Sequence, residues 1–266
     1  NSLTAAMYTA LADAVEQAER NTDVRVLVFQ GHETVFCAGN DIADFLHNPP
    51  STLDAPVFRL LRNIAAFPKP VLAAVAGPAV GIGTTLLFHC DLVYAGDNAA
   101  FAMPFVNLGV CPEAASSLLA PQMMGYHRAA EALLLGEPFM AEAALEVGLV
   151  NRVLPPTEVN SYVQAQARKL AAKPLSSLLE TKRLMKAGQA LGQVVPMVAT
   201  GGAAGAGQAG SGGGGASAAG SIGAGTNDKV GGAGGNGVAS SISGSSVTYA
   251  GGGAGGSAHW LGRSAS

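Results

Sequence analysis

Residues 71–95 read VLAAVAGPAVGIGTTLLFHCDLVYA, and this stretch decides the fold. The apolar run 71–75 predicts a buried strand, and the glycine-containing residues after it predict a tight turn. A helical pattern then runs from Gly83 to Cys90, and residues 92–95 predict another buried strand. Because strands separated by helices pair in parallel, the stretch predicts an α/β core with a mostly parallel sheet.

The same alternation continues on both sides of this stretch. Apolar spacing predicts a helix over 3–20, capped by Asn1 or Ser2, and the run 24–30 predicts a buried strand. A strand is also predicted at 149–153, and helices are predicted at 52–67, 114–122, 126–135, 140–147, 157–172 and 175–187. These elements place the predicted core within residues 1–190.

The composition changes sharply at residue 191. Residues 191–266 hold 25 of the 36 glycines and carry three charged side chains, namely Asp228, Lys229 and Arg263. Glycine loses the most backbone entropy on ordering, and few large apolar groups are present to offset that loss. We therefore expect a disordered low-complexity tail. Its run VASSISGSSVTYAGGG, residues 238–253, weakly resembles glycine-rich segments of phage tail proteins.

Charge and cysteine usage exclude several classes of protein. The chain has 15 Lys and Arg against 18 Asp and Glu, so no basic excess favours a nucleic-acid partner. Its three cysteines show no CxxC spacing, which argues against a disulfide framework and a metal site and favours a cytoplasmic location. The sequence contains no run of about 18 uncharged apolar residues, so we expect no membrane-spanning helix and no membrane partner. The residues from Asn1 onward follow a helical pattern, so we expect no signal peptide.

Two glycine-containing turns are candidates for ligand binding. They read FCAGNDI over residues 36–42 and AGPAVGIGTT over residues 76–85. Small residues let a ligand approach the main chain, and free amides at a helix N-terminus favour negative charge. The second turn matches neither a P-loop nor a dinucleotide fingerprint. Taken singly, each turn predicts no more than a tight connection.

Together with CDLVYAG over residues 90–96, the two turns resemble the crotonase (enoyl-CoA hydratase/isomerase) superfamily across residues 1–188. The resemblance implies a spiral of ββα units, an acyl-CoA thioester substrate, no separate cofactor, and a homotrimer or dimer of trimers. It also implies an oxyanion hole formed by the N–H groups of Asn40 and Ile82. The implied substrate contacts are Ala38, Gly39, Asp41, Ile42, Gly81, Gly83 and Phe105.

The acid/base residues select the reaction within this superfamily. Family hydratases hold water between two glutamates, whose places are taken here by Thr85 and Phe105, and neither side chain is a base near neutral pH. Further on, Glu113 in NLGVCPEAASS resembles the single catalytic glutamate of the Δ3,Δ2-enoyl-CoA isomerase branch. We expect it to take a proton from C2 of a 3-enoyl-CoA and return it to C4. The alternative role is to complement the dipole in the first turn of helix 114–122.

Other functions remain open from the sequence. Glu113 could activate water in a hydratase, or residues 191–266 could form a structural or attachment protein. The chain also lacks the N-terminal strand pair and C-terminal helices implied by the resemblance, so an inactive truncated core is a further alternative. Asp41 is expected to be a turn or cap residue and His89 a core histidine. Four basic residues could contact CoA phosphates, namely Lys69, Lys182, Arg183 and Lys186. A solvated helix face explains the last three equally well.

Overall fold

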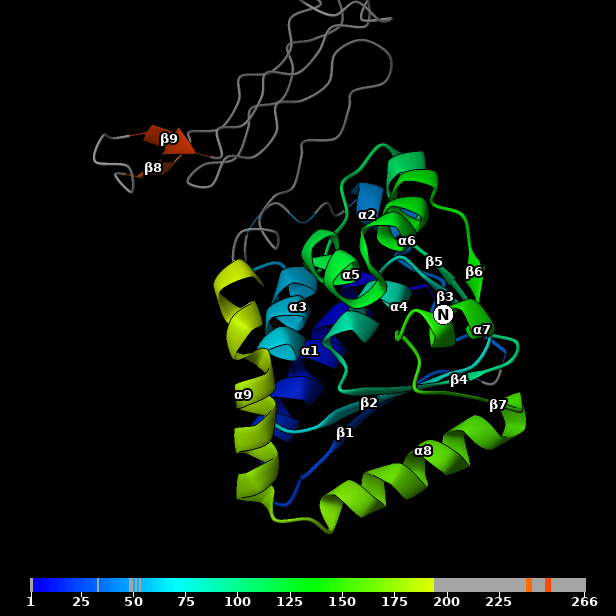
Figure 1. The fold of residues 1–266 in the computed structure, drawn as a ribbon, viewed down its shortest axis with the longest axis vertical. Coiled ribbons are helices and arrows are strands. Elements are labelled where there is room, and N and C mark those ends of the chain that lie inside the picture. The colour runs from blue at the N-terminus through cyan, green and yellow to red at the C-terminus, as the bar shows by residue number, and fades with distance from the viewer. Residues whose placement is uncertain are drawn as a thin grey trace, which may run out of the picture. The chain divides into compact units, whose positions relative to one another are not determined.

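The computed structural model of the protein describes residues 2–32, 34–47, 50, 52, 54–193, 238–240 and 247–249 (Figure 1). The chain forms two units. The first comprises Asn1–Pro104 with Ala114–Gly192, and the second comprises Phe105–Glu113 with Gln193–Ser266. The predicted oxyanion turns therefore belong to the first unit, and Glu113 belongs to the second.

A four-stranded parallel sheet forms the centre of the first unit. Its order is β1 (Leu27–Gln30), β2 (Val71–Val75), β4 (Leu92–Gly96) and β7 (Arg152–Leu154). All five residues of β2 are buried, as expected for a central parallel strand covered on both faces. The predicted α/β core with a parallel sheet is confirmed.

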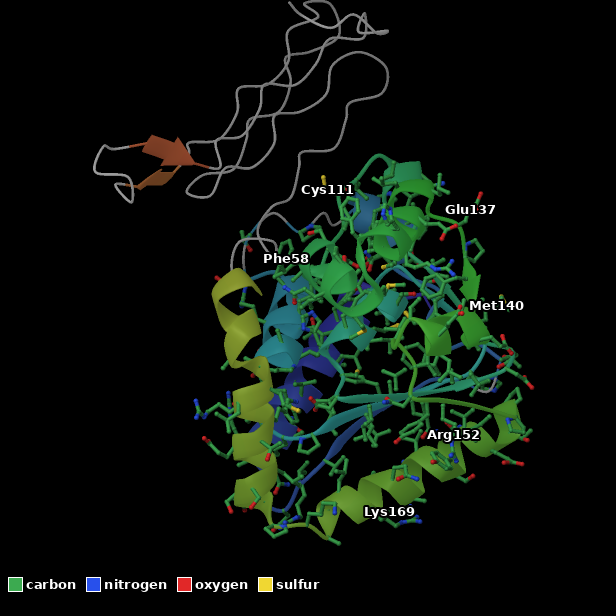
Figure 2. The ribbon with its side chains drawn as sticks, in the orientation of Figure 1. Phe58, Cys111, Glu137, Met140, Arg152 and Lys169 are labelled. Atoms are coloured by element: carbon green, nitrogen blue, oxygen red, sulfur yellow. The ribbon has the colours of Figure 1, made fainter. Side chains whose placement is uncertain are left out.

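Helices cover this sheet. α8 (Pro156–Ala171) runs along one face of the sheet in Figure 1, and its Val159 and Val163 pack against Leu72 and Tyr94. These two valines are four residues apart and therefore share one face of the helix. Arg152 of β7 lies 5.3 Å from the ring centroid of Tyr162 on α8, and Figure 2 labels it beside that helix. The other helices are α1 (Ala5–Arg20), α2 (Ile42–His47), α3 (Pro56–Ala66), α4 (Ile82–Thr85), α5 (Ser116–Met124), α6 (Tyr126–Ala130), α7 (Ala141–Glu146) and α9 (Leu175–Gln193).

A second, smaller sheet was not predicted. Strands β3 (Pro78–Val80) and β5 (Ala100–Ala102) pair in parallel, and β6 (Phe139–Met140) pairs antiparallel with β5. Each strand has only two or three residues, which is too short for an alternating pattern to indicate it. β3 matters for the site because it lies within the predicted turn 76–85 and leads directly to Gly81 and Ile82.

Several predicted boundaries are corrected by local hydrogen bonding. α1 begins at Ala5 and is capped by Thr4, whose Oγ1 accepts from Met7 N at 3.4 Å, so the expected caps Asn1 and Ser2 are wrong. Leu3 instead forms a parallel bridge with Asn40.

The predicted helices at 83–90 and 126–135 each change geometry part-way. α4 continues as a 3-10 helix, η1 (Leu86–His89), and α6 continues as a π-helix, η3 (Glu131–Leu135). β7 begins at Arg152 rather than at residue 149. α9 extends to Gln193, beyond the predicted end at 187.

The second unit contains a short 3-10 helix, η2 (Val106–Leu108), which ends at Gly109 in the left-handed conformation. Val110 N donates to Phe105 O at 3.0 Å and closes this turn. Strands β8 (Val238–Ser240) and β9 (Val247–Tyr249) pair antiparallel within the region expected to be disordered. The expected disorder of 194–237, 241–246 and 250–266 lies outside the described residues.

Candidate active site

The two predicted turns lie next to each other in the first unit. Cys37 forms a parallel bridge with Ala79 of β3. Its N–H donates to Pro78 O at 3.1 Å, and its carbonyl accepts from Val80 N at 2.9 Å. The first turn is thus bonded to the strand that enters the second turn.

The glycines allow the two turns to approach this closely. A Cβ atom on Gly83 would lie 2.8 Å from Cys37 Cβ and 2.9 Å from Cys37 O, so no side chain fits there without movement of the backbone. A Cβ on Gly39 would lie 3.3 Å from Val80 O. Gly39 therefore faces the residue that precedes Gly81 and Ile82. The structure brings the segments carrying both predicted amide donors together.

The first donor has a defined direction. Gly39 O accepts from Leu3 N at 2.8 Å, and Asp41 N donates to Leu3 O at 2.9 Å. In a trans peptide the carbonyl and the N–H point in opposite directions, so the Asn40 N–H points away from Leu3. Within the described residues, this N–H donates no backbone hydrogen bond.

The second donor begins a helix. Ile82 is the first residue of α4, and its N–H has no acceptor within the helix. The turn before it is fixed because Gly81 N donates to Ala102 O at 2.9 Å. The hydroxyl of Thr84 strengthens this attachment, since it donates to Ala79 O at 2.6 Å and accepts from Ala102 N at 3.2 Å. Two amide donors on adjacent, rigid turns are suited to bind one oxyanion.

Side chains from α1 and α2 support the first turn. Asp41 Oδ1 accepts from Asp44 N at 2.9 Å and caps α2, which confirms its predicted role as a cap. Asp44 Oδ2 in turn accepts from Ala5 N at 2.6 Å. The buried Tyr8 donates its hydroxyl hydrogen bond to Asn40 Oδ1. Tyr8 and Asp44 were not predicted, because no local pattern links α1 to a turn more than 30 residues away.

The remaining predicted substrate contacts differ in exposure. Ala38 is exposed and Ile42 is 63% exposed, whereas Gly39 and Gly83 are buried. Exposed Ala38 and Ile42 are accessible to a ligand. Buried Gly39 and Gly83 serve the packing of the turns.

Glu113 lies in the second unit, immediately before Ala114. α5 begins at Ser116, and Ala114 and Ala115 have left-handed φ values of 52° and 56°. The alternative that Glu113 occupies the first turn of this helix is therefore wrong. The residue as a whole is half-buried, but its carboxyl oxygen Oε1 is buried. Burial raises the pKa of Glu113 to about 7.

The other candidate residues have structural roles or no ionisable group. Thr85 and Phe105, which the resemblance aligns with the two glutamates of family hydratases, are both buried. His89 is buried, and its Nε2 is 2.8 Å from Ala114 O. Burial lowers the pKa of His89 to about 4, so the ring is neutral near pH 7. His89 is a core histidine, as predicted.

The position of Lys182 contradicts the prediction of a solvated helix face. Lys182 is buried and its Nζ lies 2.7 Å from Asp91 Oδ2 and 2.8 Å from Lys69 O, so it does not belong to a solvated helix face. Lys69 is also buried and donates to Ala18 O and Asn21 O at 2.7 Å. These two ammonium groups join elements of the fold and are already bonded to protein oxygens.

The other two cations are less enclosed. Lys186 Nζ donates to His89 O at 3.2 Å, while Arg183 is exposed and paired with Glu180. A hollow of about 460 Å³ lies between the end of α3 and α9, with Lys182, Arg183 and Lys186 in its lining. None of the predicted oxyanion residues lines it.

Two kinds of feature are absent from the described part of the chain. No helix among those residues is long and apolar enough to cross a membrane. Nor do three or more His, Cys, Asp or Glu side chains in that part gather in an arrangement that could hold a metal ion.

Comparison with known proteins decides the family. The model of the family described as enoyl-CoA hydratase/isomerase matches residues 1–195. The chain belongs to the enoyl-CoA hydratase/isomerase family. Its membership in this crotonase superfamily of enzymes confirms the resemblance drawn from the glycine turns.

Relatives within the family carry different activities in their names. The chain is 37% identical over 192 residues to enoyl-CoA delta isomerase 2 from Rattus norvegicus, covering 70% of this chain and 49% of the relative. It is 32% identical over 190 residues to 2,3-dehydroadipyl-CoA hydratase from Escherichia coli, covering 71% and 74%. The chain thus spans about half the length of the rat relative.

A solved structure agrees with the fold. The structure of Pseudomonas aeruginosa OdaA superposes with a TM-score of 0.70 at 49% identity, covering 71% of this chain and 77% of that one. The crotonase fold is therefore supported by both sequence and structure.

Proposed function

We propose that this chain moves the double bond of a 3-enoyl-CoA to the 2-position, with Glu113 carrying the proton. The observation that carries the proposal is the buried carboxyl oxygen Oε1 of Glu113, since this burial raises the pKa of the group to about 7. A carboxyl group with this pKa both accepts and donates a proton at neutral pH. Coenzyme A is part of the substrate, and the reaction needs no separate cofactor.

In the first step, the Glu113 carboxylate removes a proton from C2. The electron pair of the broken C–H bond passes into the thioester, and negative charge develops on its oxygen. The N–H groups of Asn40 and Ile82 would donate to this oxygen. Loss of one such donor costs roughly 3–4 kcal/mol of transition-state stabilisation.

In the second step, the dienolate takes the proton at C4. Glu113 gives back the proton that it removed, and the new double bond lies between C2 and C3, conjugated with the thioester. The proton count balances with one carboxyl group, so no water and no second base takes part.

The residues at the hydratase positions favour isomerisation. The resemblance implies that family hydratases need two glutamates to add water. Here the buried Thr85 and Phe105 stand at those two positions. A hydratase that uses Glu113 alone to activate water is the second candidate. It is supported by the relative named 2,3-dehydroadipyl-CoA hydratase.

The two candidates are separated by substrates offered side by side. Purified full chain would be given a 3-enoyl-CoA and the corresponding 2-enoyl-CoA, with the Glu113→Gln variant as control. The proposal predicts faster isomerisation than hydration, and loss of isomerisation in the variant. Faster hydration would replace the isomerase by the hydratase.

We also propose self-association through α6 and η3, as a homotrimer or dimer of trimers. Large apolar side chains are exposed there, including Tyr126 at 72% and Leu134 at 64%. Apolar patches of this kind mark protein interfaces. Sedimentation velocity would measure the assembly, and a monomer at micromolar concentration would contradict it.

A further inference from the structure

A set of contacts holds residues 39–44 against the start of α1. Leu3 bonds to both Gly39 and Asp41, and Asp44 Oδ2 accepts from Ala5 N at 2.6 Å. The contact between two side chains in this set joins the Tyr8 hydroxyl to Asn40 Oδ1. All these residues belong to the first unit.

Tyr8 is well suited to hold a neighbour in place. It is 5% exposed, and its N–H donates to Thr4 O at 2.9 Å within the first turn of α1. The ring therefore starts from an ordered helix and has little freedom to move. A buried hydroxyl that loses its acceptor is costly, so the contact between the buried Tyr8 and the half-buried Asn40 restrains both partners.

The peptide that carries the Asn40 N–H requires such a restraint. That peptide joins Gly39 to Asn40, and Gly39 has φ +90° with no Cβ to limit its rotation. Leu3 N holds the Gly39 carbonyl at one edge of this peptide. Tyr8 holds the Asn40 side chain at the other end. The two contacts together fix the direction of the N–H.

We propose that Tyr8 is a positioning residue, which aims the Asn40 N–H at the thioester oxygen by hydrogen bonding to the Asn40 side chain. The inference rests on the proposed function for its kinetic consequence. Its structural consequence is independent of the reaction, because any bound thioester would be polarised by the same N–H. Tyr8 touches no reacting atom and acts through Asn40.

The test uses the variants Tyr8→Phe, Asn40→Ala and the double variant in the full chain. Tyr8→Phe removes one hydroxyl and keeps the ring, so the fold is retained. We expect kcat on a 3-enoyl-CoA to fall about tenfold with KM nearly unchanged, since a misaimed donor loses part of the hundredfold or greater effect of a missing one. Asn40→Ala should give a similar loss, and the double variant should lose no more than either single variant.

A spectroscopic readout separates positioning from stability. Octanoyl-CoA labelled with ¹³C at the thioester carbonyl cannot isomerise, and its infrared carbonyl stretch reports polarisation by the donors. We expect binding to wild type to lower the stretching frequency and Tyr8→Phe to reduce that shift. Tyr162→Phe is the matched control, because the ring of Tyr162 packs between α8 and the sheet and not against the turns. Its ring centroid lies 5.1 Å from that of Tyr94. It should change neither kcat nor the carbonyl shift.

The outcomes distinguish this inference from the proposed function. A wild-type carbonyl shift that Tyr8→Phe reduces supports the inference even when no isomerisation is detected, and the missing isomerisation then counts against the reaction alone. An unchanged shift and unchanged kcat in a folded Tyr8→Phe variant would overturn the inference while leaving the isomerase in place. Additive losses in the double variant would also overturn it.

Discussion

In the proposed mechanism, the two glycine turns and the segment 105–113 supply chemistry in opposite ways. In the turns the functional groups are backbone N–H groups, while the side chains of Asn40 and Ile82 are bonded or buried elsewhere. In the segment the functional group is one carboxyl, and burial gives it its pKa of about 7. The turns should therefore depend on side chains only through the direction of these N–H groups, and they should not tolerate added volume at Gly83. The segment should depend on one side chain and its surroundings.

Glu113→Gln should give the largest loss of kcat for isomerisation. It removes the proton carrier but keeps size and polarity, so kcat should fall about 10³-fold with little change in KM. The matched control is Glu137→Gln, an exposed glutamate labelled at the surface in Figure 2. Steady-state kinetics of isomerisation would measure both variants. A Glu113→Gln variant with more than a tenth of the wild-type kcat would assign the proton transfer to another residue.

Gly83→Ala should give the next largest loss of kcat. It tests whether the turns are sensitive to added volume, whereas Glu113→Gln tests a single side chain. The new Cβ would meet Cys37 at 2.8 Å and push the turns apart. We expect kcat to fall about 100-fold and the free energy of unfolding to fall by about 2–3 kcal/mol. Gly148→Ala is the control, since its Cβ would meet nothing within 4 Å but its φ is +80°.

This control should lose about 1–2 kcal/mol of stability through backbone strain and keep its kcat. Urea unfolding and kinetics would be measured on the same samples. Equal kcat in wild type and Gly83→Ala would mean that the contact between the turns does not define the site.

The pH dependence should follow Glu113. Because burial raises the pKa to about 7, the carboxyl is protonated below that pH and cannot act as a base. We expect kcat/KM to rise about tenfold per pH unit up to pH 7 and then level off. A profile that levels off near pH 4.5, the ordinary value, would show that Glu113 is not the base or is not buried.

The same shift predicts a smaller effect on stability. The folded-state pKa lies above the unfolded value of 4.5, so this contribution is fully present below pH 4.5 and is lost as pH rises through about 7. The loss amounts to about 3 kcal/mol for a shift of this size. Urea unfolding of wild type and Glu113→Gln between pH 4.5 and 8 would measure it, and parallel curves for the two proteins would contradict it.

The sequence predicted the features that are local. The apolar run of β2 and the glycines of both turns each report their own conformation, so the parallel core and the two donor segments could be identified. The strands β3, β5 and β6 were missed, since two or three residues carry no periodicity.

The features set by distant contacts could not be predicted. Tyr8 meets Asn40 from 32 residues away, and Lys182 meets Asp91 from 91 residues away. Lys182 was expected to be solvated but is buried. Its burial depends on the contact with Asp91, because a charge is stable in an apolar environment only with a partner. The two turns and the carboxyl of the proposed site could thus be identified from the sequence, whereas the side chains that contact the first turn could not.

A crystal structure of the full chain with octanoyl-CoA would test the central claim most directly. We expect the thioester oxygen within about 3 Å of both Asn40 N and Ile82 N, with the Glu113 carboxyl beside C2 and C4 of the acyl chain. A thioester oxygen bound by other groups, or a Glu113 carboxyl turned away from the acyl chain into solvent, would contradict the account.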